Sequence, residues 1–204
     1  MNQLPSKTLE KAVDELAKLP GIGKNTALRL ALHIIKQDED YIHSLSTSIQ
    51  DLQDKIMHCN ICKSISDTEI CSICADYNRD NSIICVVENI KDVLSIEKTE
   101  TYKGKYHILG GVISPIDGIG PQDINIESLM QRLENLTVKE LIMALPTTIE
   151  GDTTLLYLYK KTHHLVPVIS TLARGVGIGD DLEYIDSNTL KRSITHRQKY
   201  EAEI

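Results

Sequence analysis

The sequence predicts an α/β protein with a mostly parallel sheet, preceded by a helical region and a cysteine-rich module. Apolar residues in the first 56 positions recur at helical spacing. Four of the five cysteines then gather between positions 59 and 74. From residue 81 onward, short β-branched runs alternate with amphipathic stretches, a pattern typical of parallel strands covered by helices on both faces.

The N-terminal region predicts three helices. Residues 8–19 carry leucine and valine at helical spacing until Pro20-Gly21 ends the pattern, and residues 26–35 resume it. A third amphipathic stretch at 42–56 leads into the cysteines.

The turn between the first two helices, in "LPGIGKNTALRL", is a candidate phosphate site. Gly21 and Gly23 permit a tight turn, and the outward amides at the start of the second helix lie at its positive dipole end. Lys24 and Arg29 add positive charge, so we expect contact with a sugar-phosphate backbone and little reading of sequence. A plain helical hairpin is the alternative. A P-loop is excluded because it would need glycine at Lys18.

Charge and aromatic content limit the mode of binding. The net charge of −7 argues against a uniformly basic nucleic-acid binder, but residues 1–37 have a basic excess whereas residues 38–58 are acidic. The chain has no Phe and no Trp, which excludes a surface of stacked Phe or Trp and predicts a core of Ile, Leu, Val and Tyr.

The cysteines form two C-x-x-C pairs separated by eight residues, namely Cys59, Cys62, Cys71 and Cys74. The chain shows no signal-peptide pattern and no apolar run near the ~20 residues that span a bilayer, which predicts a cytoplasmic protein with reduced thiols. Two thiolate pairs suit one tetrahedral structural Zn²⁺ per chain, four unpaired thiols being the alternative. We expect Cys85, in an apolar run, to be a buried hydrophobe.

The α/β part contains five candidate strands, "SIICVVE", "YHILGG", "ELIMAL", "HLVPVIS" and "LEYID". Helical patterns at 126–136 and 153–161 lie between them. The expected divisions of the chain are 1–56, 57–80, 81–176 and 177–204.

Six stretches together resemble the RecR family of bacterial recombination mediators over essentially the whole chain. They are "LPGIGKNTALRL", the cysteine block, "VVENIKDVLSIE", "YHILGGVISPIDGIGP", "TIEGDTT" and "ARGVGIGDDLEYIDSNTLKRSITHR". The resemblance implies, in the four divisions, a helix-hairpin-helix, a four-cysteine zinc finger, a Toprim domain and a C-terminal oligomerisation segment with a Walker-B-like strand. It also implies a ring-like homo-oligomer, dimer or tetramer, that clamps DNA and acts with RecO or RecF to load recombinase at single-stranded gaps.

The resemblance extends to the residues of the hairpin. The expected DNA-contacting residues are Gly21, Gly23, Lys24, Asn25 and Arg29. Relatives usually carry a basic residue where Asn25 stands. We therefore expect Lys24 and Arg29 to supply a larger share of the DNA affinity.

The same resemblance bears on catalysis. Catalytic Toprim domains hold Mg²⁺ with a glutamate after the first strand and a D-x-D pair later; Glu88 matches the glutamate, but Pro146 and Thr148 occupy the aspartate positions. We therefore expect a protein that is not an enzyme, the alternative being a Mg²⁺-dependent nuclease or topoisomerase. Weak Mg²⁺ binding and ordinary solvated carboxylates both remain open for Glu88, Asp92, Glu150 and Asp152.

The C-terminal region offers two further features. "LEYID" looks like a Walker B strand without a Walker A, and "GVGIGDD" is best explained as a turn. A second basic set consists of Arg174, Lys191, Arg192 and Arg197, for which a solvated face and a contact with DNA or a neighbouring subunit are both open.

Overall fold

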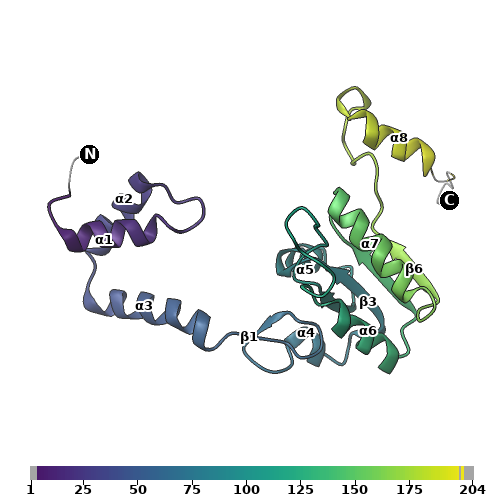
Figure 1. Cartoon of the computed structure of the whole chain (residues 1–204), viewed down its shortest axis with the longest axis horizontal. Helices are drawn as coiled ribbons and strands as arrows, with labels where there is room; N and C mark the ends of the chain where they lie inside the picture. Colours follow the sequence, from purple (N-terminus) through teal and green to yellow (C-terminus); the bar gives the residue numbers. More distant parts are fainter. Residues whose placement is uncertain (1–3, 198, 200–204) are drawn as a thin grey trace. The chain divides into compact units, whose positions relative to one another are not determined.

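The computed structural model describes residues 4–197 and 199, and the chain divides into two units after Ile56. The described part of the first unit consists of α1 (Lys7–Leu16), α2 (Lys24–Ile34) and α3 (Glu39–Asp54), labelled in Figure 1. These are the three helices that the sequence predicts.

Helices α1 and α2 form a hairpin around a small core. Val13 of α1 packs with Ala27 and Ala31 of α2, all three buried. The small alanines allow the two helix backbones to approach closely. Helix α1 ends at Leu16, earlier than expected, because the following residues form tighter turns such as the Leu19 N–H to Leu16 carbonyl bond of 3.2 Å. Helix α3 has no buried residue.

The second unit is built on a four-stranded parallel sheet. Its strands are β3 (Asp80–Val87), β4 (Gly104–Ile108), β5 (Glu140–Ala144) and β6 (Val168–Thr171), in the order β4-β3-β5-β6. All three pairings are parallel. The predicted fold class, with strands separated by helices, is confirmed.

Helices cover both faces of this sheet. Helices α6 (Ile126–Asn135) and α7 (Ile149–Thr162) pack on one face, and α5 (Ile90–Glu97) packs on the other (Figure 1). Alternate residues of β3 serve the two faces, so that Val86 joins the first core and Val87 the second. Cys85 is buried in the second core, as expected.

The cysteine-rich module precedes the sheet. It comprises an antiparallel pair, β1 (Met57–His58) and β2 (Ile65–Ser66), followed by the short helix α4 (Ser72–Ala75). The Ile108 N–H at the end of β4 donates to the Cys62 carbonyl at 2.8 Å. A backbone hydrogen bond thus ties the module to the edge of the sheet.

The C-terminal segment corrects one expectation. The expected Walker-B-like strand in "LEYID" is a 3₁₀ turn, η1 (Leu182–Tyr184), followed by α8 (Ser187–Thr195). Local bonding explains this, because the Tyr184 N–H reaches the Asp181 carbonyl at 3.0 Å and the parallel sheet ends at β6. Asp186 instead caps α8 by accepting from the Asn188 and Thr189 amides. No helix within residues 4–197 has both the length and the apolar character required to cross a membrane.

Candidate nucleic-acid interface and metal centre

The hairpin turn presents the start of α2 to solvent. Gly21 has a φ of +78°, the left-handed region that favours glycine, and Gly23 is the N-cap of α2. Glycine has no side chain to cap the helix, and no side-chain hydrogen bond from this N-cap reaches the first amides of α2. These amides lie at the positive end of the helix dipole, an arrangement suited to phosphate oxygens.

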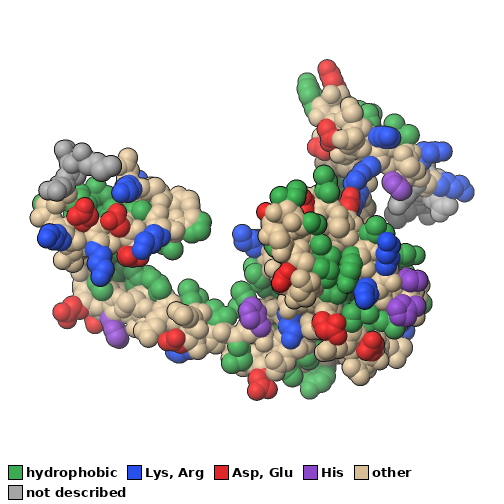
Figure 2. Space-filling model, in the orientation of Figure 1, with side chains coloured by type: hydrophobic (Ala, Val, Ile, Leu, Met, Phe, Trp, Pro, Cys, Tyr) green, Lys and Arg blue, Asp and Glu red, His purple; other side chains and the backbone are tan. Residues whose placement is uncertain are grey.

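Two exposed cations lie on this helix, Lys24 as its first residue and Arg29 in its second turn. Lys24 approaches Asp14 at 3.6 Å, but both side chains are more than half exposed, so the pair restrains Lys24 little. Arg29 and Asn25 line a shallow groove of about 390 Å³ along α2. Acidic side chains are interspersed with the basic ones on this unit (Figure 2), in keeping with weak binding by a few cations.

The four cysteines of the two C-x-x-C pairs converge on one point. Their sulfur atoms all lie within 4.8 Å of one another, and Cys59, Cys62 and Cys71 are buried. A regular tetrahedron around Zn²⁺, with Zn–S bonds of about 2.3 Å, has S–S edges of about 3.8 Å. The four donors therefore fit a closed tetrahedral metal site. No other group of three or more such metal-binding side chains occurs among the described residues.

Local backbone geometry sets up this cluster. Lys63 adopts a left-handed φ of 63°, which turns the chain so that its N–H bonds the Cys59 carbonyl at 3.0 Å. The Cys71 amide donates to the Cys59 sulfur at 3.3 Å, and the Cys74 amide donates to the Cys71 sulfur at 3.4 Å. Such N–H donors stabilise thiolates, the form that binds metal.

Burial opposes ionisation of three of the thiols in the absence of a cation. Burial raises the pKa of Cys71 to about 11, and a hydrogen bond with Cys74, together with burial, raises the pKa of Cys62. For Cys59 burial acts in the same sense, but the amides around its sulfur lower its pKa to about 6. A divalent cation would supply the charge that lets all four bind as thiolates.

The four acidic residues considered for Mg²⁺ do not form one cluster. Glu88 follows β3, where burial and then the nearby Asp92 raise its pKa. An Asp92 oxygen accepts the Asn89 amide at 3.0 Å in the capping box of α5. Glu150 and Asp152 lie in the first turn of α7.

Two arginines hold Asp152. One of its oxygens accepts from Arg174 at 2.5 Å and the other from Arg192 at 3.1 Å. The Arg174 hydrogen bond is the largest of the effects that lower the pKa of Asp152. Thr148 caps α7 by accepting the Gly151 amide at 3.1 Å. The Asp152 pairs could not be predicted from the sequence because their members lie 22 and 40 residues apart, a separation that carries no local signal.

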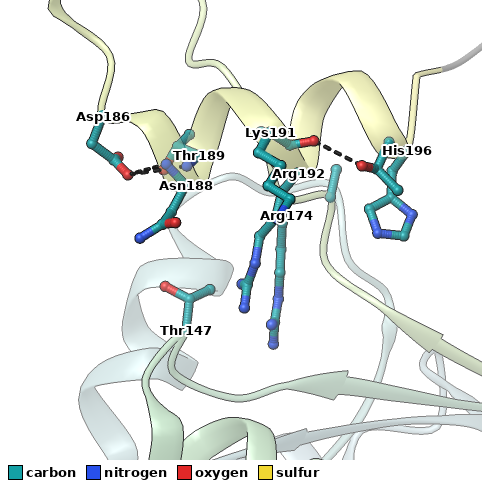
Figure 3. Close-up of a pocket in the computed structure, with 11 residues that line it drawn as sticks. Thr147, Arg174, Asp186, Asn188, Thr189, Lys191, Arg192 and His196 are labelled. Atoms are coloured by element: carbon teal, nitrogen blue, oxygen red, sulfur yellow. Dashed lines mark hydrogen bonds between the residues drawn. The ribbon is translucent and has the colours of Figure 1, made fainter.

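The C-terminal basic residues converge on a pocket between α8 and the end of β6. The pocket has a volume of about 850 Å³, and Arg174, Lys191 and Arg192 line it. Figure 3 shows the Arg174 and Arg192 side chains running side by side into the space beside Thr147. Arg197 lines the adjoining groove together with Arg192. The fold thus unites the basic set that the sequence shows only as scattered residues.

Comparison with known proteins identifies the family. Family models match residues 9–52 as "RecR, helix-hairpin-helix", 82–170 as a Toprim domain and 175–198 as "RecR, C-terminal". Recombination protein RecR of Bacteroides fragilis is 52% identical over 198 residues, covering 97% of both chains. The RecR of Flavobacterium johnsoniae is 50% identical over 199 residues, covering 98% of this chain and 97% of its own. The chain therefore belongs to the RecR family of recombination proteins.

Proposed function

We propose that the chain is a non-enzymatic recombination mediator that clamps DNA through its backbone and acts with RecO or RecF to load recombinase at single-stranded gaps. The observation that carries this proposal is the uncapped, exposed start of α2, which begins at Lys24 and carries the exposed Arg29 in its second turn. This arrangement supports binding to phosphates without base contacts. A structural Zn²⁺ held by the four cysteines completes the proposal.

Self-association would compensate for weak contacts by each chain. With a net charge of −7, one chain offers little positive surface, and several linked hairpins would multiply the affinity. Helix α3 carries an exposed apolar row of Ile42, Leu45, Ile49 and Leu52 at spacings of three and four residues. We assign this row to contact with a second copy. Hairpin contacts and C-terminal contacts of two-fold type would then close a ring with basic residues in its lumen.

The absence of an acidic D-x-D pair supports a role without phosphoryl-transfer chemistry. Two-metal catalysis needs several carboxylates around both ions. Here Pro146 and Thr148 replace the aspartates, and Asp152 is already paired with arginines.

DNA binding by hairpin variants tests the clamp. We expect Lys24→Ala and Arg29→Ala each to weaken binding to single-stranded and duplex DNA about three- to tenfold, equally for all sequences, and to reduce the salt slope by about one per cation. The measurement is fluorescence anisotropy across a salt series. Lys139→Ala, an exposed cation on the Toprim domain, is the matched control. If the Lys24→Ala/Arg29→Ala double variant binds DNA at low salt as tightly as the wild type, the hairpin is not the DNA contact.

The enzymatic alternative has its own test. Supercoiled DNA incubated with the protein and Mg²⁺ should remain intact. Nicking or relaxation that disappears in Glu88→Ala would replace the mediator proposal with a Toprim nuclease or topoisomerase.

A further inference from the structure

A buried lysine joins the cysteine module to the sheet. Lys105 of β4 is only 3% exposed, although lysine is almost never buried without a partner. Its ammonium group donates to the carbonyls of Ile73, Cys74 and Asp76 at 2.8, 3.1 and 2.7 Å. These carbonyls belong to α4 and the residue that follows it, so the lysine holds the backbone at Cys74, one member of the second C-x-x-C pair.

A second cation lies against the same strand. Arg132 of α6 donates through one terminal nitrogen to the Tyr106 carbonyl of β4 at 2.6 Å. Its Nε is buried and has no hydrogen-bond acceptor among the described residues. Within the described chain, neither Arg132 nor Lys105 forms a salt bridge with a carboxylate.

Such unpaired buried cations are costly unless an opposite charge lies nearby. The cysteine cluster can provide one, because Zn²⁺ with four thiolates carries a net charge of −2. The pKa of Arg132 shows both effects. Burial lowers this pKa, and negative charge on Cys74, Cys62 and Cys59 raises it. The cations and the cluster thus supply charges of opposite sign across one small interface.

We propose that Lys105 and Arg132 are positioning residues that compensate the negative charge of the metal–tetrathiolate centre and lock it to the Toprim sheet. The inference rests on the proposed zinc site. The two cations come from different elements, β4 and α6. Lys105 contacts the Cys74 carbonyl, and Arg132 bonds Tyr106, two residues before Ile108, whose amide bonds the Cys62 carbonyl. Compensation lowers the basicity and nucleophilicity of the bound thiolates and slows loss of the metal.

The test measures zinc retention in the full-length, zinc-loaded protein. Zinc transfer to a chromogenic chelator and alkylation of the cysteines by N-ethylmaleimide are followed in Arg132→Met, Arg132→Lys and Lys105→Met. We expect Arg132→Met and Lys105→Met to release zinc at least tenfold faster and to be alkylated faster. Arg132→Lys, which keeps the charge, should stay within about threefold of wild type. Lys103→Met, an exposed cation two residues before Lys105, is the control and should match wild type.

Each outcome has a defined meaning. If the wild-type protein contains no zinc, the proposed metal site is wrong. If the wild type and Arg132→Met both contain zinc and release it at equal rates, only the role of the cation is overturned. Arg132→Lys that loses zinc as fast as Arg132→Met would show that shape matters and charge does not, which also overturns the proposal. If Arg132→Met fails to fold, folding of Arg132→Lys with its zinc supports the charge requirement, and failure of both variants contradicts it.

Discussion

At the scale of single residues, Arg79 and Glu97 form a bidentate ion pair. One terminal nitrogen of Arg79 donates to Glu97 at 2.9 Å, and the other contacts the second carboxylate oxygen. The Tyr106 hydroxyl donates to the same carboxylate at 2.7 Å. The Arg79 side chain is 13% exposed, and its charge is met by Glu97 and, at 3.7 Å, by Asp76. These donors, the Arg79 hydrogen bond first, lower the pKa of Glu97.

This pair predicts a change in acid stability. Glu97→Gln should lower the free energy of unfolding at pH 7 by about 1–3 kcal/mol, because a largely buried arginine loses its bidentate charged acceptor and keeps only the longer contact with Asp76. A carboxyl group whose pKa is lowered by folding stabilises the protein above its unfolded pKa of about 4.3, and this contribution disappears as pH falls through the folded pKa. The wild type should therefore lose its advantage over Glu97→Gln below about pH 4.

Urea unfolding at pH 7 and pH 3 checks this prediction. Glu134→Gln, at an exposed position of α6, is the control. A difference between wild type and Glu97→Gln that stays the same at both pH values would contradict the assigned role of the charge.

At the scale of elements, the cysteine module should act as one folding unit with the sheet. We expect about one zinc per wild-type chain. Cys71→Ser should lose the metal and lower the Tm by about 10 °C or more, because losing a structural metal site costs several kcal/mol.

Cys85→Ala is the matched control, since Cys85 is a buried cysteine outside the cluster. It should keep its zinc and lower the Tm by only a few degrees. Metal analysis and thermal unfolding measure both effects. Zinc-free wild type together with normal melting of Cys71→Ser would refute the structural metal.

The Asp152 pairs also act between elements, because they hold α8 and the Arg174 loop against α7. All three side chains are partly exposed, so the pairs contribute only about 1 kcal/mol in water. Asp152→Asn should therefore raise protease cleavage within α8 about fivefold without unfolding the sheet.

Limited proteolysis with mass spectrometry measures this change. Glu150→Gln is the control, since Glu150 lies in the same turn and forms no salt bridge in the described chain. If Asp152→Asn is cleaved at the wild-type rate, the Asp152 pairs do not hold α8 in place, and its apolar contacts do.

At the scale of the whole molecule, DNA binding and self-association should be coupled. Deleting residues 190–204 removes most of α8 and the cations Lys191, Arg192 and Arg197. We expect oligomer size and DNA affinity to fall together while the zinc stays bound, because a ring retains DNA topologically and pools weak contacts.

Light scattering with and without DNA, combined with anisotropy and metal analysis, tests the coupling. A strictly monomeric truncated protein that binds DNA as well as the full chain would refute it.

Features with local causes could be predicted from the sequence alone. The C-x-x-C spacing brings the two cysteines of each pair close together in a tight turn. Two such pairs are typical ligands of one zinc ion, so the convergence of Cys59 and Cys62 with the second pair could be predicted. The β-branched runs and helical periodicities likewise indicated the parallel sheet and its helices, because side-chain spacing sets which face is buried. The glycine turn before α2 was foreseeable from the freedom of Gly21 to adopt a positive φ.

Features that depend on distant segments were decided by the tertiary structure. The sequence contains Asp152, Arg174 and Arg192, but only the packing of α8 near α7 makes them partners. Lys105 and Arg132 look like ordinary surface cations until β4 and α6 bring them beside the cysteine module. "LEYID" resembles a strand by composition, yet a strand needs a neighbour to bond, and local i to i+3 bonds form there instead. Spacing along the chain encodes local geometry, whereas long-range partners are settled by which segments fold side by side.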